Sequence, residues 1–168
     1  MRPPRRPVGG TVTIGVYGFD GGSFLRCLQQ AGVRLLLDVR QRRGDRGPDY
    51  SWATSVRLQG ALAAAGLGYR HVKELAPTTE LRRLQYREDD RRGVGKRNRV
   101  ALASEYAERY TREILDPFDL GALVAELPGE SVTAFFCVER DPEACHRSLV
   151  AERLRTAHGL AVTNLRPG

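Results

Sequence analysis

The sequence predicts an α/β protein, namely one three-layer domain with a mostly parallel sheet of about five strands and helices on both faces. The first observation is that short β-branched or apolar runs alternate with segments of helical length, an order that is typical of right-handed β-α-β units. The second is the run VRLLLDV at residues 33–39. This run is nearly all apolar, which favours a central strand that helices cover on both faces.

The first half of the chain contains the first strands and helices of this alternation. They are expected at residues 11–17 (strand), 24–31 (helix), 33–39 (strand), 52–65 (helix) and 69–72 (strand). The strands are β-branched or apolar runs between turn residues. The first helix follows a glycine-rich loop and is expected to stop near Gly32. The second carries apolar residues at helical spacing before Gly66, and glycine readily takes the left-handed conformation that ends a helix.

The second half of the chain continues the alternation. Its elements are expected at residues 102–115 (helix), 120–127 (helix), 131–138 (strand), 142–158 (helix) and 160–165 (strand). In the last helix, Asp141 is expected to be the N-cap and Pro142 to occupy the first helical position. This arrangement places Cys145 and His146 in the first turns of the helix, and Gly159 is expected to end it.

Composition indicates a cytoplasmic protein with one main domain. A chain of 168 residues is long enough to bury a core without disulfides. Its three cysteines lack the spacing of a disulfide framework, which favours free thiols in a reducing compartment. No apolar run approaches the roughly 20 residues that cross a bilayer, so we expect no membrane partner. The basic, proline-rich segment 1–10 has no apolar signal core, and we expect a flexible arm there before a domain at 11–168.

The chain is basic, and nearly all of its positive charge is arginine. It has 27 Lys and Arg against 20 Asp and Glu, a net charge of +7, and Lys73 and Lys96 are its only lysines. The planar arginine fork suits phosphate, which indicates an anionic small molecule or a nucleic acid as partner. The composition bias of a GC-rich genome explains the same charge without a partner. Residues 78–100 combine arginines with Tyr86 and are interpreted as a charged insertion or lid, although the acidic residues 88–90 interrupt the patch.

Polar residues that follow the predicted strands indicate one functional site. The carboxyl ends of parallel strands meet at one edge of the sheet, where ligands bind in such folds. The residues expected at that edge are Tyr17, Asp38, Arg40, Glu74, Cys137, Glu139, Cys145, His146 and Arg147. We therefore expect one shared pocket.

Four of these residues are candidate catalytic groups. A thiol near a helix N-terminus and near arginines is expected to ionise readily, which makes Cys145 a candidate nucleophile. His146 is a candidate acid or base, and Asp38 and Glu74 are candidates for handling protons or ligand hydroxyls. The alternative for each is structural: a buried cysteine, a hydrogen-bonded histidine, a solvated glutamate, or a salt bridge between Asp38 and Arg40 that ends the strand.

The remaining candidates are ligand- or anion-binding groups: Tyr17, Arg40, Cys137, Glu139 and Arg147. Arg147 either turns inward to hold an anion or pairs with Glu143 one helical turn before it.

A metal site is not predicted. Cys137, Cys145 and His146 are competent zinc ligands, but an adjacent Cys and His are not expected to converge on one ion from a helix. No CxxC or HxxxH spacing supports them. The glycines near residue 18 do not spell GxGxxG, and no motif identifies a cofactor.

Four motifs make the chain resemble the family catalogued as domain of unknown function 488. They are TIGVYG at 13–18, LDVR at 37–40, EL at 74–75 and CVERDPEACHRS at 137–148. The resemblance runs from about Thr11 to Leu165, and its specific part is a strand that ends in Cys and is followed by Asp-Pro-x-x-Cys-His-Arg. Many members carry His-Ser where this chain has Val16 and Tyr17. The resemblance implies a small bacterial α/β protein and leaves the reaction open.

Two functions fit these observations. The first is a small enzyme that acts on a nucleotide, a nucleic acid or another phosphorylated ligand through the Cys/His/Arg site. The second is a noncatalytic module that binds nucleic acid or protein through the arginine-rich segment 82–99 and the N-terminal arm. The oligomeric state does not follow from the sequence.

Overall fold

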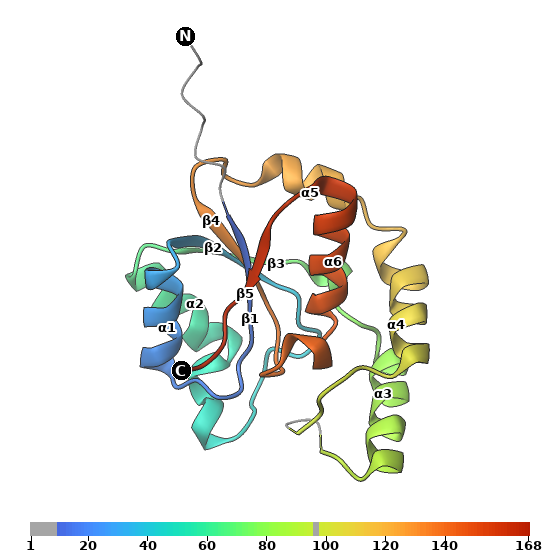
Figure 1. Cartoon of the computed structure of the whole chain (residues 1–168). Coiled ribbons are helices and arrows are strands. Elements are labelled where there is room, and N and C mark those ends of the chain that lie inside the picture. Colours follow the sequence, from blue (N-terminus) through green and yellow to red (C-terminus); the bar gives the residue numbers. More distant parts are fainter. Residues whose placement is uncertain (1–9, 96–97) are drawn as a thin grey trace.

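Five parallel strands form the sheet of the computed structural model, which describes residues 10–95 and 98–168 (Figure 1). Their order is β3-β2-β4-β1-β5. The strands are β1 Thr11–Ile14, β2 Val33–Asp38, β3 Gly68–His71, β4 Val132–Phe136 and β5 Val162–Asn164. The predicted α/β class with a parallel sheet of about five strands is confirmed. The arm predicted at 1–10 lies outside the described residues, except for Gly10.

Helices cover both faces of the sheet, as predicted. The α-helices are α1 Gly21–Gln30, α2 Ser55–Ala64, α3 Thr79–Arg92, α4 Ser104–Tyr110, α5 Leu120–Glu126 and α6 Arg147–His158. The shorter turns are η1 Pro48–Ala53, η2 Lys73–Leu75, η4 Pro142–Ala144 and a π-helical turn, η3 Thr111–Leu115, that continues α4. Figure 1 shows α1 and α2 on one side of the sheet and α3, α4 and α6 on the other.

The middle of the sheet belongs to β4, not to residues 33–39 as predicted. The crossover from β1 to β2 passes over β4, and the crossover from β4 to β5 passes over β1. The strand β2 still lies inside the sheet, between β3 and β4. Ile14, Leu36 and Phe135 on three different strands are all fully buried. Apolar content therefore indicates burial on both faces, and it does not rank the buried strands by position.

The chain leaves the neighbouring strands β2 and β4 in opposite directions. After β2 it continues to α2 on one face of the sheet, and after β4 it continues to α6 on the other (Figure 1). Such a divergence opens a crevice at the carboxyl ends of the strands, where ligands bind in open α/β sheets.

Glycine ends three of the predicted helices at the expected places. Gly32, Gly66 and Gly159 have φ angles of +75°, +75° and +64°, in the left-handed region that favours glycine after a helix. The helix predicted at 52–65 begins only at Ser55, because the residues before it form the separate turn η1.

The helix predicted at 142–158 is divided. The turn η4 is followed by Cys145 in an extended conformation (φ −132°, ψ 146°), and α6 begins after His146, which is its N-cap. Asp141 makes no side-chain cap hydrogen bond; its carboxylate instead accepts from Arg166 at 3.2 Å. Cys145 and His146 therefore precede the helix, and the prediction that they lie in its first turns is wrong.

Candidate functional site

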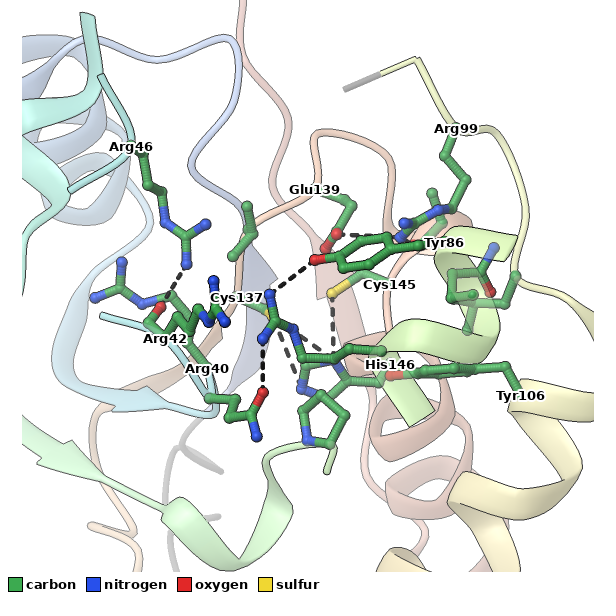
Figure 2. Close-up of a pocket in the computed structure, with 17 residues that line it drawn as sticks. Arg40, Arg42, Arg46, Tyr86, Arg99, Tyr106, Cys137, Glu139, Cys145 and His146 are labelled. Atoms are coloured by element: carbon green, nitrogen blue, oxygen red, sulfur yellow. Dashed lines mark hydrogen bonds and ion pairs between the residues drawn. The ribbon is translucent and has the colours of Figure 1, made fainter. Parts of the chain in front are cut away.

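A pocket opens at the carboxyl ends of β2 and β4 (Figure 2). Its walls come from the segments after these two strands, from α3, and from the loop and helix that follow α3. The wall includes Arg40, Arg42, Arg46, Arg82, Gln85, Tyr86, Arg99, Tyr106, Cys137, Glu139, Cys145 and His146. The cavity measures about 60 Å³, which is room for about two water molecules at their share of roughly 30 Å³ in the liquid. A small group such as a phosphate fits this space.

Two cysteines and a histidine form a buried cluster in the pocket wall. Cys137 directly follows β4, and Cys145 and His146 lie between η4 and α6. The Nδ1 atom of His146 lies 3.6 Å from the Cys137 sulfur and 3.8 Å from the Cys145 sulfur. The Cys137 sulfur also lies 3.7 Å from Nε2 of the same ring. The extended backbone at Cys145 thus brings its thiol to the imidazole that the strand-end thiol also contacts.

The hydrogen bonding of His146 determines which ring nitrogen faces the thiols. Its Nε2 atom lies 2.9 Å from the backbone oxygen of Val39. A carbonyl oxygen only accepts hydrogen bonds, so Nε2 carries a hydrogen and donates it. The Nδ1 atom therefore remains available to the two sulfur atoms.

The three side chains of this cluster shift one another's pKa values. Burial alone raises a thiol pKa, but for Cys145 the hydrogen bond with Cys137 and the charges of His146 and Arg147 outweigh burial and hold the pKa well below its usual range. Burial and the neighbouring Cys145 raise the pKa of Cys137 well above its usual range. Burial opposes the charging of His146, yet the Cys145 thiolate raises the pKa of the imidazole. These shifts favour the thiolate at Cys145 over Cys137.

A chain of charged groups supports the pocket from the α3 side. Arg99 donates to both carboxylate oxygens of Asp89, with the shortest contact at 2.6 Å. It also reaches Glu139 at 3.2 Å, and Gln85 donates to Asp89 at 2.9 Å. Burial and the Cys145 thiolate raise the pKa of Glu139 to about 7, against the opposing charge of Arg99. This network connects α3 to the segment after β4.

Asp38 and Arg40 form a buried pair below the pocket. The Arg40 Nε and Nη2 atoms donate to the two carboxylate oxygens of Asp38 at 2.9 Å each. Arg40 Nη1 donates to the Ala53 oxygen at 2.8 Å, and the guanidinium lies over the Phe136 ring. The hydroxyl of Tyr69 donates to Asp38 at 2.6 Å. The structural role for this pair, one of the two alternatives above, is the one that these contacts support.

Arg147 turns inward. It is fully buried and donates to the backbone oxygens of Glu139 at 2.6 Å and Arg140 at 3.2 Å. Glu143 pairs with Arg166 instead, at 3.0 Å. Gly15 allows this packing, since a Cβ atom there would meet the Glu139 oxygen at 2.0 Å. Arg147 thus anchors the start of α6 to the loop after β4.

The fold brings together some of the predicted site residues and separates others. Those that line the pocket are Arg40, Cys137, Glu139, Cys145 and His146. Asp38 and Arg147 lie buried behind the wall, and Tyr17 lines a neighbouring depression, where its ring packs edge-on against Tyr50. Glu74 is exposed on η2 and does not line the pocket.

Sequence reasoning missed several wall residues, which lie mainly in the segment interpreted as an insertion or lid. Gln85 on α3 and Arg99 in the loop after it are buried residues of the wall, and Asp89 on α3 is buried behind them. Leu81, Gln85 and Asp89 occur every fourth residue, so they share one face of a helix. This four-residue spacing was the sequence signal for a buried helix face, but the many charged residues around it favoured the interpretation of a solvated segment. Motion of this segment as a lid stays a prediction.

An arginine-lined depression adjoins the pocket. It measures about 590 Å³ and is lined by Tyr17, Arg42, Arg43, Gly44, Asp45, Arg46 and Arg82. Arg82 donates to two neutral oxygens, those of Gln41 and Tyr86. Among residues 10–95 and 98–168, no carboxylate forms an ion pair with Arg42, Arg43 or Arg82. The lining holds four arginines and one acidic residue, Asp45, so the depression carries an excess of positive charge.

Comparison with known proteins identifies one family. The family model described as "Domain of unknown function DUF488" matches residues 22–154, a range that includes every residue of the pocket wall. Searches of the curated proteins and of the solved structures gave no match. None of the helices in the described part of the chain is long and apolar enough to span a membrane.

Proposed function

The chain belongs to the DUF488 family, whose description leaves the activity open, and we propose that it is a small enzyme that acts on a phosphorylated ligand. The anionic group of the ligand lies among the arginines, and the reacting atoms lie against Cys137, Cys145 and His146. A nucleotide or the end of a nucleic acid fits this class, since both present phosphate beside a group that can react.

The observation that carries the proposal is an excess of arginine around a small pocket with buried reactive side chains. The pocket wall holds five arginines, Arg40, Arg42, Arg46, Arg82 and Arg99, and one acidic residue, Glu139. Two of these arginines, Arg40 and Arg99, are paired with carboxylates. Arg42 and Arg82 keep charge that a phosphate can take up through charge-assisted hydrogen bonds.

The two cavities would hold different parts of the ligand. The pocket of about 60 Å³ accepts only a small group, whereas the adjoining depression of about 590 Å³ accommodates a larger body. Arg42 and Arg82 line both spaces. A phosphate held by them would therefore keep one end of the ligand at the Cys-His cluster, a positioning that is itself a large part of catalysis.

The alternative of a noncatalytic binding module has weaker support. Its arginine-rich segment is partly neutralised, because Arg91 and Arg92 both pair with Glu88 at 2.6 and 2.7 Å. Arg99 is buried in the pocket wall, and Arg97 lies outside the described residues. A noncatalytic binding surface also requires no buried thiol beside a histidine, so this alternative gives the Cys-His cluster no role.

The test is binding and turnover with a panel of phosphorylated compounds. Calorimetry with inorganic phosphate, nucleoside mono-, di- and triphosphates and short single-stranded oligonucleotides identifies the ligand, and phosphorus NMR detects its conversion. Arg82→Gln is expected to weaken binding by about 10- to 100-fold, the effect of one charge-assisted hydrogen bond. Arg83→Gln, an exposed neighbour on α3, is the matched control and is expected to change binding less than about twofold.

Two results would contradict the proposal. One is that no phosphorylated compound binds to the folded protein. The other is that Arg82→Gln and Arg83→Gln weaken binding equally, because the arginines would then act only through the net charge of the protein.

A further inference from the structure

We propose that Cys137, Cys145 and His146 form a three-ligand site for a transition-metal ion, with zinc as the expected metal and a fourth coordination position open to the pocket. The proposal concerns the pocket of the proposed function and deepens it, since it assigns the chemistry of the cluster. The metal site itself does not depend on the ligand being phosphorylated.

The distances from the two sulfur atoms to Nδ1 of His146 match those around a tetrahedral ion. Zinc lies about 2.3 Å from a thiolate sulfur and about 2.0–2.1 Å from an imidazole nitrogen, so tetrahedral angles separate sulfur from nitrogen by about 3.6 Å. The two sulfur atoms lie 3.6 and 3.8 Å from Nδ1 of His146. All three donor atoms lie within 4.8 Å of one another. Two thiolate sulfurs on one tetrahedral zinc lie about 3.8 Å apart, so binding of one ion by all three donors requires the cysteine side chains to adopt that separation.

The orientation of His146 is the one that a metal ligand needs. A ligating histidine almost always donates its other ring N-H to a backbone carbonyl or a carboxylate, which fixes the ring and its tautomer. Nε2 of His146 lies 2.9 Å from the Val39 oxygen, and Nδ1 lies 3.6 and 3.8 Å from the two sulfur atoms. The hydrogen bond to the end of β2 thus holds the free nitrogen toward the metal position.

A metal explains why both cysteines lie against one imidazole. A nucleophile and its base need a single thiol beside the imidazole, and Cys137 would then contribute only a hydrogen bond to Cys145. In a metal site both thiols are ligands. From the sequence, the adjacent Cys145 and His146 were not expected to converge on one metal ion from a helix. In the structure Cys145 has an extended backbone and precedes the helix, and the third donor comes from the end of β4.

The donor set selects the kind of metal. Thiolate and imidazole favour zinc and other borderline or soft ions, whereas calcium and magnesium need oxygen ligands. Three protein ligands with an open position are typical of catalytic zinc sites, and structural sites close the fourth position with protein. All three donors line the pocket. A metal there would act as a Lewis acid on an oxygen atom of the ligand or on a water molecule.

Metal content and cobalt spectroscopy of the full chain test the site. The protein, purified with reductant, is expected to hold one zinc per chain by mass spectrometry. Cobalt in place of zinc is expected to give thiolate-to-cobalt charge-transfer bands in the near ultraviolet and the visible bands of a tetrahedral ion. Absence of both metal and thiolate-cobalt bands in the folded wild-type protein would overturn the proposal without recourse to any variant.

Cysteine variants locate the site. Cys137→Ser and Cys145→Ser are each expected to lower metal affinity on the order of 100-fold or more, since even the partners of ligands contribute about 10- to 100-fold. Cys27→Ser is the matched control, because Cys27 lies on α1, away from the cluster, and it is expected to keep the metal. If Cys145→Ser keeps full affinity, or Cys27→Ser loses as much, the assignment is wrong. Circular dichroism of each variant separates lost ligands from lost fold.

Ligand binding to metal-free protein separates this inference from the proposed function. If no metal binds but a phosphorylated compound does, the metal site is wrong and the proposed function stands, with Cys145 as its nucleophile. If metal binds but no phosphorylated compound does, the metal site stands and the proposed function fails.

Discussion

Replacement of Arg40 by methionine tests whether the buried pair below the pocket is structural. Arg40 and Asp38 both have fully buried side chains, joined by two hydrogen bonds of 2.9 Å. Methionine retains much of the arginine volume but removes the charge. Asp38 then stays buried with the Tyr69 hydroxyl and one backbone N-H as partners. An uncompensated buried carboxylate costs about 3–5 kcal/mol of unfolding free energy.

Urea unfolding measures this loss, and a double-mutant cycle isolates the pair. In a domain of this size, a loss of 3–5 kcal/mol corresponds to a fall of roughly 6 to 20 °C in Tm. Asp38→Asn combined with Arg40→Met removes both charges, so its loss is expected to fall below the sum of the single losses by about 1–3 kcal/mol. Arg34→Met, at an exposed position of β2, is the control, with an expected change within about 0.5 kcal/mol.

Two outcomes would refute this reasoning. If Arg40→Met costs less than about 1 kcal/mol, the Asp38 carboxylate is not held in a low-dielectric environment. If the double variant is additive, the two side chains do not stabilise each other, and a direct role of Asp38 in the pocket regains support.

Three further substitutions have expected outcomes in urea or thermal unfolding. Arg99→Met is expected to cost about 3–5 kcal/mol of unfolding free energy because Asp89 is left buried without its cation. The control, Arg87→Met on the exposed face of α3, should change stability by less than about 0.5 kcal/mol. Equal effects of the two variants would contradict the buried network. Gly15→Ala should cost about 1–3 kcal/mol or more, since its Cβ meets a backbone oxygen at 2.0 Å, and a neutral result would show that β1 and the loop after β4 do not approach closely. Gly60→Ala, inside α2 with no atom within 4 Å of the added Cβ, should stabilise by about 0.5–1 kcal/mol, and a loss there would argue against the helix.

The sequence by itself determined the α/β class, the approximate strand positions and the ends of three helices. These features depend on contacts between near neighbours. An apolar run such as residues 33–39 indicates burial on both faces, and Gly66 and Gly159 end helices through their own backbone freedom. The edge of the sheet that carries the polar residues also followed, because parallel strands have all their carboxyl ends on one side.

Local rules were less reliable where a distant contact competed with them. Asp141 and Pro142 form a sound helix-start signal, yet α6 begins later, at Arg147. The buried guanidinium of Arg147 holds the backbone oxygens of Glu139 and Arg140. This anchoring to the loop after β4 places the start of the helix, and no pattern within the segment reports it.

Only the tertiary structure decided which polar residues share the pocket. Arg99 comes to Glu139 because α3 packs beside the segment after β4, whereas Glu74 turns to solvent one turn after β3. Strand order and the direction of each side chain place these groups, and both depend on contacts between residues far apart in the chain. The Cys-His cluster has the same origin, since the end of β4, an extended residue before α6 and the Val39 oxygen after β2 must all be in place before three donor atoms converge.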